Sequence, residues 1–320
     1  MKQKRVSVIW VLCIVMVLLL ASSADASLSD WANQIRAGIT GHATSQSVVV
    51  NVSVTTNAPT VTFVTVVTPR DPTENGVTGV SVNFTANDAD GVGNINDTSA
   101  LVNITYTTTG EGTRTNSTCS KIQSGGTNSN YSCIVNMWYF DIAGTWNVTA
   151  SIMDASLSLG QNRSTNFTYN SLTAFVLSPA SVSFASISPG ATNTTSNNDP
   201  IILNNTGNYS VTLGNVQMNA TNLVGEVTST QAIYANNMTV GVTTGSNAEC
   251  DLSATNQTIR MTKSNFASVT NSTLGRGNNS LNNGITGQEQ LYVCILLAGN
   301  ELSQQAYSTA GQGSWTVKIV

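Results

Sequence analysis

The sequence is poor in the side chains that most enzymes use for acid–base chemistry. Its single histidine, His42, lies in a polar stretch that we expect to be a linker, so no Ser-His-Asp or Cys-His arrangement can be assembled within a domain. The six glutamates are scattered and the aspartates concentrate in expected turns, which argues against paired carboxylates for glycoside hydrolysis. We therefore expect that the protein is not an enzyme.

Charged residues are scarce as well, at 9% of the chain, and lysine is rare after position 5. Without residues 1–26, nine basic residues would stand against fifteen acidic ones, a net charge near −6. A chain with so few cations cannot neutralise a phosphate backbone, so nucleic acid is not an expected partner. Low charge normally limits solubility, and another source of hydration is therefore expected.

The one long apolar run lies at the N-terminus. Three basic residues precede the run from Val6 to Ala21, and Ala24-Asp25-Ala26 follows it, a layout typical of a secretory signal peptide. The run is shorter than the roughly 20 residues that cross a bilayer. We expect residues 1–26 to be a signal peptide and the mature protein to be secreted to the extracellular cell surface. The alternative is that the segment stays as a membrane anchor; no C-terminal anchor is expected.

Four cysteines remain after the signal segment, and four cysteines allow three pairings. Because two fall in each half of the chain, we expect the disulfides Cys119–Cys133 and Cys250–Cys294. An even number of cysteines in an exported chain suits an oxidising exterior. The alternative is four reduced, buried thiols.

Asn-x-Ser/Thr sequons are the most abundant motif, and there are more of them than the abundance of Asn, Ser and Thr alone would give. Each is an N-glycan acceptor signal in an exported chain, and sugars would supply the hydration that charge does not. The alternative is that some sequons are unused, because Asn- and Thr-rich strands create them incidentally. In the expected strands around Asn83, Asn103, Asn147 and Asn208, alternation should turn the asparagine outward. The seventeen candidate glycosylation sites are Asn51, Asn83, Asn96, Asn103, Asn116, Asn130, Asn147, Asn162, Asn166, Asn193, Asn204, Asn208, Asn219, Asn237, Asn256, Asn271 and Asn278.

Residues 27–58 form an N-terminal segment with two features. Ser27 to Gly38 has helical spacing of apolar residues and predicts a short helix. The segment that follows the linker alternates valines with polar residues and predicts a strand. It suits an assembly strand that completes the sheet of a neighbouring subunit, and the alternative is the first strand of its own domain. The residues of this candidate donor strand are Val48, Val50, Val52 and Val54.

Two-residue alternation recurs through the rest of the chain between Gly, Asn, Asp and Pro turns. We predict an all-β fold with two antiparallel β-sandwich domains, Ig-like or jelly-roll-like, at residues 59–170 and 171–320. We expect Trp138 and Trp146 to fill the first core. The expected inward-facing sets of the first domain include Val61, Phe63, Thr65 and Val67; Val80, Val82 and Phe84; and Cys133, Val135 and Met137. The expected strands of the second domain include Ile201–Leu203, Tyr209–Leu213, Val216–Ala220, Ala232–Val242, Gln290–Leu297 and Trp315–Val320.

An acidic loop carries the only metal-binding pattern that we identify. Asp88, Asp90 and Asp97 lie close together, and oxygen ligands from closely spaced acids suit a structural calcium ion. The spacing does not meet the EF-hand pattern. The alternative is an Asx-rich turn whose side chains bind their own backbone. No other cofactor is expected.

Two stretches resemble known families. The sequences VTFVTVVTPRDPTENGVTGVSVNFTANDADG and YFDIAGTWNVTASIMDAS resemble immunoglobulin-like domains of prokaryotic surface proteins. The second half, with SVSFASISPGATNT and LNNTGNYSVTLGNVQM, is similar to sandwich modules of archaeal cell-surface glycoproteins and, more loosely, to the jelly-roll subunits of camelysin-type biofilm fibres. These resemblances imply a fold and an archaeal surface location rather than an activity.

The function that these features favour is structural. We expect an N-glycosylated subunit of an extracellular filament or surface layer, self-associating through non-covalent contacts into a homopolymer or lattice. The alternative is a secreted adhesin or carbohydrate-binding module. For that alternative the sequence offers no evident cluster of exposed aromatic residues.

Overall fold

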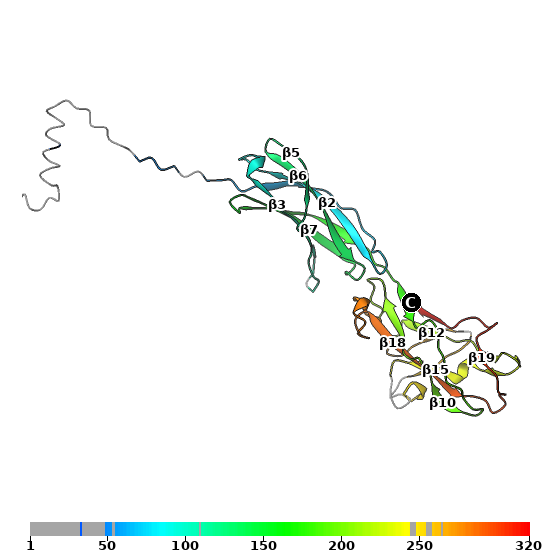
Figure 1. The fold of residues 1–320 in the computed structure, drawn as a ribbon. Helices are drawn as coiled ribbons and strands as arrows, with labels where there is room; N and C mark the ends of the chain where they lie inside the picture. The colour runs from blue at the N-terminus through cyan, green and yellow to red at the C-terminus, as the bar shows by residue number, and fades with distance from the viewer. Residues whose placement is uncertain are drawn as a thin grey trace, which may run out of the picture. The chain divides into compact units, whose positions relative to one another are not determined.

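The computed structural model describes residues 33, 49–52, 55–108, 110–243, 248–253, 258–263 and 265–320 (Figure 1). The expected signal peptide and short helix lie outside these residues, apart from the single residue 33. Residues Thr56–Val320 form one compact unit, and the preceding residues Met1–Thr55 form another. The larger unit is built from β-strands, and the helical elements in its described part are short 3-10 turns.

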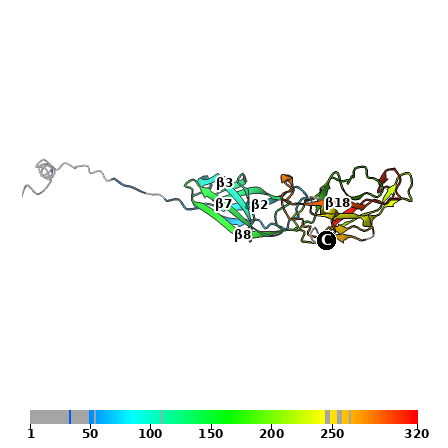
Figure 2. The same cartoon turned by 90° about the horizontal axis from the view of Figure 1, so that it is seen from below.

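The first sandwich contains two four-stranded sheets in which every strand pairing is antiparallel. One sheet has the strand order β1-β2-β6-β5 and the other β4-β3-β7-β8. The long strands β3 and β7 are neighbours in one sheet, and the long strand β2 belongs to the other (Figures 1 and 2). The strands are β1 (Thr60–Val64), β2 (Val77–Asn87), β3 (Ile95–Tyr106), β4 (Arg114–Asn116), β5 (Ser120–Gly125), β6 (Asn128–Trp138), β7 (Gly144–Asp154) and β8 (Leu159–Tyr169).

The core of this sandwich follows the expected alternation along β2, β6 and β7. Val80, Val82 and Phe84 on β2 are buried, as expected, and the Phe84 ring stacks on Tyr131 of β6 with centroids 5.1 Å apart. Trp146 on β7 is fully buried and donates its indole N–H to the Ile142 carbonyl oxygen at 2.9 Å. A buried Trp therefore has its polar atom satisfied, which is the condition for placing it in a core.

Two expectations for this core are wrong. The register of β1 against β2 shifts between Val61 and Phe63, which is the signature of a β-bulge, and this turns Phe63 outward with 54% of its surface exposed. Trp138 is also outside the core, with 43% exposure. Its place on β6 explains this, because Met137 beside it points inward and neighbours on a strand face opposite sides.

The second sandwich is more irregular, with shorter strands in three sheets. The largest has the order β16-β15-β18-β11-β9, with β10 also pairing β18; the others are β17-β12-β20 and β14-β13-β19. Its long central strand is β18 (Gln288–Leu297). The other strands are β9 (Phe175–Ser178), β10 (Thr192–Thr195), β11 (Ile201–Asn205), β12 (Val216–Asn219), β13 (Leu223–Gly225), β14 (Ala232–Ile233), β15 (Met238–Gly241), β16 (Ile259–Arg260), β17 (Ala267–Ser268), β19 (Tyr307–Ser308) and β20 (Thr316–Ile319).

Strand prediction was less accurate here. The expected strand Tyr209–Leu213 is absent, and only an isolated bridge between Val211 and Leu274 remains. The expected strand Ala232–Val242 is divided by a 3-10 turn at Ala235–Asn237 into β14 and β15, which belong to different sheets. A chain that moves from one sheet to another must break its ladder, and hydrophobic alternation does not show such a break.

The two sandwiches have separate hydrophobic cores, one built from residues between Val61 and Tyr169 and the other from residues between Ile201 and Leu302. The all-β, antiparallel sandwich class expected from the sequence is therefore confirmed.

Candidate functional site

Both expected disulfides are present. Cys119 is bonded to Cys133 across 14 residues, and Cys250 to Cys294 across 44 residues. The first joins the loop between β4 and β5 to strand β6, and the second joins a 3-10 turn to β18. Two disulfides within one chain indicate folding in an oxidising environment.

Four sequon asparagines share one local geometry. In Asn96, Asn116, Asn162 and Asn278, the side-chain oxygen accepts hydrogen bonds from the backbone N–H and the hydroxyl of the Ser or Thr two positions later. This is an Asx turn closed by the hydroxyl residue of the sequon itself. The turn uses the side-chain oxygen of the asparagine. The amide nitrogen, which is the atom that carries a glycan, points away from the Ser or Thr that the oxygen binds.

Asn208 differs from the other described sequon asparagines because it is buried, with 3% exposure. Its side-chain nitrogen donates to the carbonyl oxygens of Asp141 at 3.0 Å and Asn170 at 2.9 Å, and its oxygen accepts the Leu172 N–H at 2.7 Å. The expected outward placement on a strand is wrong here, because residues 206–209 form a turn packed against the first sandwich. Both amide hydrogens are used, so no hydrogen is left to be replaced by a sugar.

The remaining candidate acceptors lie in partly or fully exposed positions, apart from Asn256, which is outside the described residues. On the strands, Asn83, Asn103 and Asn147 are part-exposed on the outer faces of β2, β3 and β7, as the alternation predicts. Their use as glycan sites stays a prediction.

The valine segment lies in the smaller unit. Val49, Val50 and Val52 are 82%, 75% and 76% exposed, and residues 49–52 belong to no strand. Val48 and Val54 lie outside the described residues. The first strand of the first sandwich is β1, which begins at Thr60, so the alternative interpretation of this segment as that domain's first strand is not supported for the residues described.

The three aspartates of the candidate calcium loop do not come together. Asp88 accepts the backbone N–H of Asp90 at 2.9 Å, and Asp90 in turn accepts the Asn57 backbone N–H at 2.6 Å. Asp97 lies instead against Lys121 and Tyr131, whose Nζ and hydroxyl are 2.9 and 2.5 Å from its carboxylate oxygens. Among the residues that the structure describes, no group of three His, Cys, Asp or Glu side chains is placed to hold a metal. The geometry of Asp88 agrees with the alternative, an Asx turn.

The surroundings of Asp97 also fix its protonation. Partial burial alone would raise its pKa, but hydrogen bonds from Tyr131 and Lys121, together with the lysine charge, outweigh burial and hold the pKa below the ordinary value. Burial is also the main cause that raises the pKa of Tyr131, so the tyrosine stays a proton donor to Asp97.

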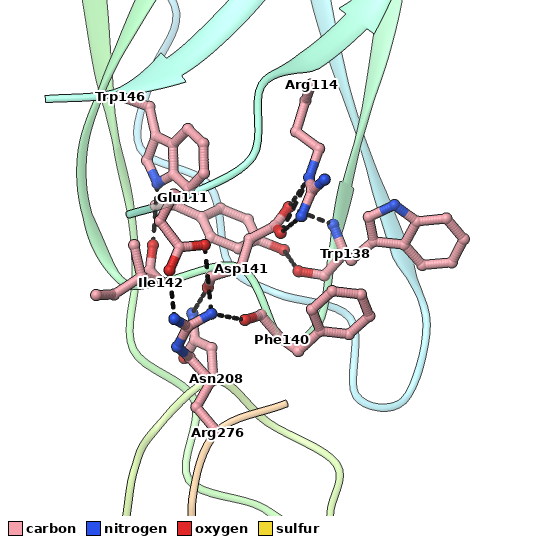
Figure 3. Close-up of polar contacts among 10 residues, drawn as sticks. Glu111, Arg114, Trp138, Phe140, Asp141, Ile142, Trp146, Asn208 and Arg276 are labelled. Carbon is pink, nitrogen blue, oxygen red and sulfur yellow. Dashed lines mark hydrogen bonds and ion pairs between the residues drawn. The ribbon is translucent and has the colours of Figure 1, made fainter. Parts of the chain in front are cut away.

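A set of polar contacts joins the two sandwiches (Figure 3). Arg276, in the loop before β18, forms an ion pair with Glu111 and donates to the Phe140 carbonyl oxygen at 2.5 Å. Both side chains are mostly buried, with 24% and 10% exposure. Figure 3 shows Asn208 and Arg276 reaching from the second sandwich toward the β6–β7 connection of the first.

The β6–β7 connection is itself held rigidly. The fully buried Asp141 accepts both Nε–H and Nη–H groups of Arg114 in an ion pair, and it also accepts the Trp138 backbone N–H at 2.7 Å. The hydrogen bond to Asp141 is the main cause that raises the pKa of Arg114. A buried carboxylate with this many charge-assisted bonds is fully compensated, which fixes the carbonyl that Asn208 binds.

Further hydrogen bonds join the two sandwiches near Asn208 and Arg276. The Thr206 hydroxyl donates to Glu74 at 2.8 Å, and its carbonyl oxygen accepts the Asn75 N–H at 2.8 Å. The Asn279 N–H donates to the Tyr139 hydroxyl at 3.0 Å. The junction is thus made by several separated segments of each sandwich, in contrast to a flexible linker at Asn170.

One aromatic cluster escaped the sequence analysis. The outward Trp138 ring stacks on Phe140 with centroids 5.9 Å apart and an interplanar angle of 11°, and the Arg114 guanidinium lies 6.0 Å from the Phe140 centroid. Strand alternation could have identified Trp138, because the inward residues of β6 have odd numbers. The position of Phe140 follows from the turn after β6, for which the sequence offers no signal.

Sequence comparisons leave the family open. No protein-family model matches the chain, and no curated protein is significantly similar to it. The resemblance to surface-protein domains therefore stays a prediction. None of the helices among the described residues has the length and hydrophobicity needed to cross a membrane.

Proposed function

We propose that the protein is a structural, N-glycosylated subunit of an extracellular filament or surface layer. The observation that carries this proposal is the contrast between its two units. The larger unit is a closed, disulfide-bonded pair of sandwiches joined by a polar junction. The smaller unit carries exposed, alternating valines that the first sandwich does not need.

The assembly step follows from the chemistry of such a segment. An extended chain with alternate apolar side chains is stabilised when it adds to a sheet edge, where its backbone gains hydrogen bonds and its valines gain burial. Val50 and Val52 are the described residues of the donor face, and burying them would contribute about 1.5–3 kcal/mol each. A second copy of the chain is the partner that this proposal requires.

An unpaired edge suited to this addition lies at β9. Among the described strands, β9 pairs with β11 alone, and Val176 and Leu177 on it are 46% and 37% exposed. An exposed apolar edge strand is normally blunted or covered in a protein that stays monomeric. This supports β9 as an acceptor for the valine segment of a neighbour.

The sequons support the surface location. The chain has little charge with which to stay hydrated, and most of its described sequon asparagines are accessible. Sugars at these positions would keep the outer faces soluble while leaving edges free for assembly.

The test is deletion of Ser47 to Thr56, the segment that would be donated. The truncated protein is expected to fold, with both disulfides formed, but to remain monomeric under conditions in which the full chain assembles. The constant-length variant Val48→Ser/Val50→Ser/Val52→Ser/Val54→Ser should behave in the same way. The control Ser53→Thr lies on the opposite face, keeps the Asn51 sequon and should leave assembly intact. Polymers formed by the truncated protein would overturn the donor-strand mechanism.

A further inference from the structure

A groove of about 410 Å³ lies on the outer side of the first sandwich, between β4 and β6. It is lined on one side by the run 113–118 and on the other by three outward residues of β6, Ile134, Asn136 and Trp138. The volume falls within the roughly 300–1,000 Å³ typical of sites for small ligands. The sequon asparagine Asn116 is itself part of the wall.

We propose that this groove seats the N-linked glycan of Asn116, so that the first sugars lie along β6 and cover Trp138. The proposal rests on the proposed function, because it requires that the protein be glycosylated. In this proposal the glycan of Asn116 has a defined binding groove on the surface of the same chain.

The geometry of Asn116 permits attachment. Its oxygen is held by the Thr118 N–H at 2.6 Å and the Thr118 hydroxyl at 3.0 Å, and its nitrogen donates one hydrogen bond, to the Ile134 carbonyl oxygen at 2.7 Å. An amide nitrogen has two hydrogens, so a sugar can replace the second while the bond to Ile134 persists. In Asn208, by contrast, both hydrogens are bonded.

The acceptor is also fixed in direction. The disulfide Cys119–Cys133 lies three residues after Asn116 on one side and next to Ile134 on the other. Together with the Asn116–Ile134 hydrogen bond, it holds the sequon against β6. A glycan that starts from a fixed atom loses less conformational freedom when it lies in the adjacent groove.

The lining matches the surface of a sugar. A pyranose ring has a rim of hydroxyls, which suits the mostly polar lining of the groove, and an apolar C–H face, for which the partly exposed Trp138 and Ile134 side chains are the apolar contacts at the groove's edge. The hydroxyl of Thr113 and the amide of Asn136 offer donors and acceptors for the rim.

The aromatic wall is preorganised. Trp138 stacks on Phe140, Arg114 lies against the Phe140 ring, and Arg114 is held by the buried Asp141. A wall that is already ordered does not lose side-chain freedom on binding, which favours a seated glycan over one that extends into solvent.

The experiment uses full-length protein from its glycosylating source. Glycopeptide mass spectrometry measures occupancy at Asn116, and hydroxyl-radical footprinting measures the oxidation rate of Trp138 in the wild type and in Asn116→Gln. Because Gln cannot form the same Asx turn, Thr118→Ala serves as a second variant that removes the sequon and keeps the Asn116 side chain. Asn162→Gln is the matched control, since Asn162 has the same Asx turn and a single bond from its nitrogen, to the Val61 carbonyl oxygen.

The expected result is glycan at Asn116 and a several-fold faster oxidation of Trp138 in Asn116→Gln and Thr118→Ala, with no change in Asn162→Gln. Occupancy at other sequons without occupancy at Asn116 would overturn this inference and leave the proposed function standing. If the glycan at Asn116 is lost and the oxidation rate of Trp138 does not change, the inference is also overturned. The same holds if a sugar from another molecule, and not the Asn116 glycan, fills the groove. A complete absence of glycans from the secreted protein would instead overturn the glycosylated surface role.

Discussion

At the scale of single residues, the same motif has different consequences in different places. Asn116 and Asn208 both begin an Asn-x-Ser/Thr sequon, yet one carries its amide beside an open groove and the other is enclosed between two sandwiches. The difference lies in how many amide hydrogens the fold uses. A sequon is therefore a necessary signal for a glycan, and the folded surroundings decide what a glycan there would disrupt.

Asn208 is expected to remain unmodified in the folded protein. Its replacement by Ala should lower the free energy of unfolding by about 2–4 kcal/mol, because two carbonyl oxygens and one N–H group would lose their partner in a buried position. Peptide mass spectrometry checks occupancy and urea unfolding checks stability. A glycan found on Asn208 of the native protein would contradict the structure of the junction.

A second expectation at this scale concerns pH. Burial raises the pKa of Asp199, and the neighbouring charge of Glu249 adds to this, although hydrogen bonds from the Val293 N–H and Ser196 oppose it. The folded state therefore binds a proton more readily than the unfolded state. Protonation of Asp199 therefore stabilises the folded state. This contribution to the free energy of unfolding is complete below pH 3.8, the ordinary pKa of an aspartate, and it is lost as the pH rises through the raised pKa of Asp199 in the folded state.

The variant Asp199→Asn removes this titration. Relative to the variant, the wild type should gain stability as the pH is lowered from neutral toward 3.8. Urea unfolding of both proteins at the two ends of this range measures the difference. A stability difference that does not change with pH would show that Asp199 titrates normally in the folded chain.

At the scale of elements, the disulfides tie loops to the central strands of their sheets. In the loop-closure description, a bridge across 14 residues contributes about 3 kcal/mol and one across 44 residues about 4 kcal/mol. Replacing Cys250 and Cys294 together by Ala should therefore lower the unfolding free energy slightly more than replacing Cys119 and Cys133. Chemical denaturation of the two double variants gives the order, and a larger loss for the shorter loop would indicate that native-state contacts dominate.

Sequence patterns predicted the elements of the first sandwich more fully than those of the second. Long strands with strict alternation, such as β2 and β6, were predicted because each has one buried and one outer face along most of its length. The bulge that exposes Phe63 and the change of sheet between β14 and β15 depend on contacts with distant strands. Such contacts cannot be predicted from the two-residue alternation of apolar side chains. The edge strands β4 and β5 were missed because neither contains a buried residue.

The candidate sites divide in the same way. Both disulfide pairings followed from the two-domain reading and are confirmed. The wall formed by Trp138, Phe140 and Arg114 was missed, because it joins a strand face, a turn and another sheet. The clustering of Asp97 with Asp88 failed because the lysine and tyrosine that face Asp97 come from β5 and β6.

At the scale of the whole molecule, the junction determines whether the two sandwiches move together. Arg276 and Glu111 form a mostly buried ion pair across it, and Arg276 also binds a carbonyl oxygen of the β6–β7 connection. In the proposed polymer, such a contact would transmit force from one sandwich to the other. A junction built only from a flexible linker would allow the sandwiches to reorient.

The variant Glu111→Gln leaves Arg276 without a counter-charge and should weaken the junction by about 1–3 kcal/mol. Hydrogen exchange should become faster at the Asn75 and Asn279 amides, which bond across the junction, and stay unchanged in the β2–β6 ladder. The exposed Glu226→Gln is the matched control. Equal exchange in both variants would indicate that the ion pair does not hold the sandwiches together.

Assembly of copies of this chain through the valine segment into an extracellular polymer is the step on which the proposed function depends. Its most direct test is negative-stain electron microscopy of the native secreted material, with boiled and unboiled samples compared on a denaturing gel. We expect filaments or a lattice, and a ladder of bands in the unboiled sample that collapses to one band after boiling. Isolated particles and a single monomer band in both lanes would contradict it and favour a monomeric adhesin.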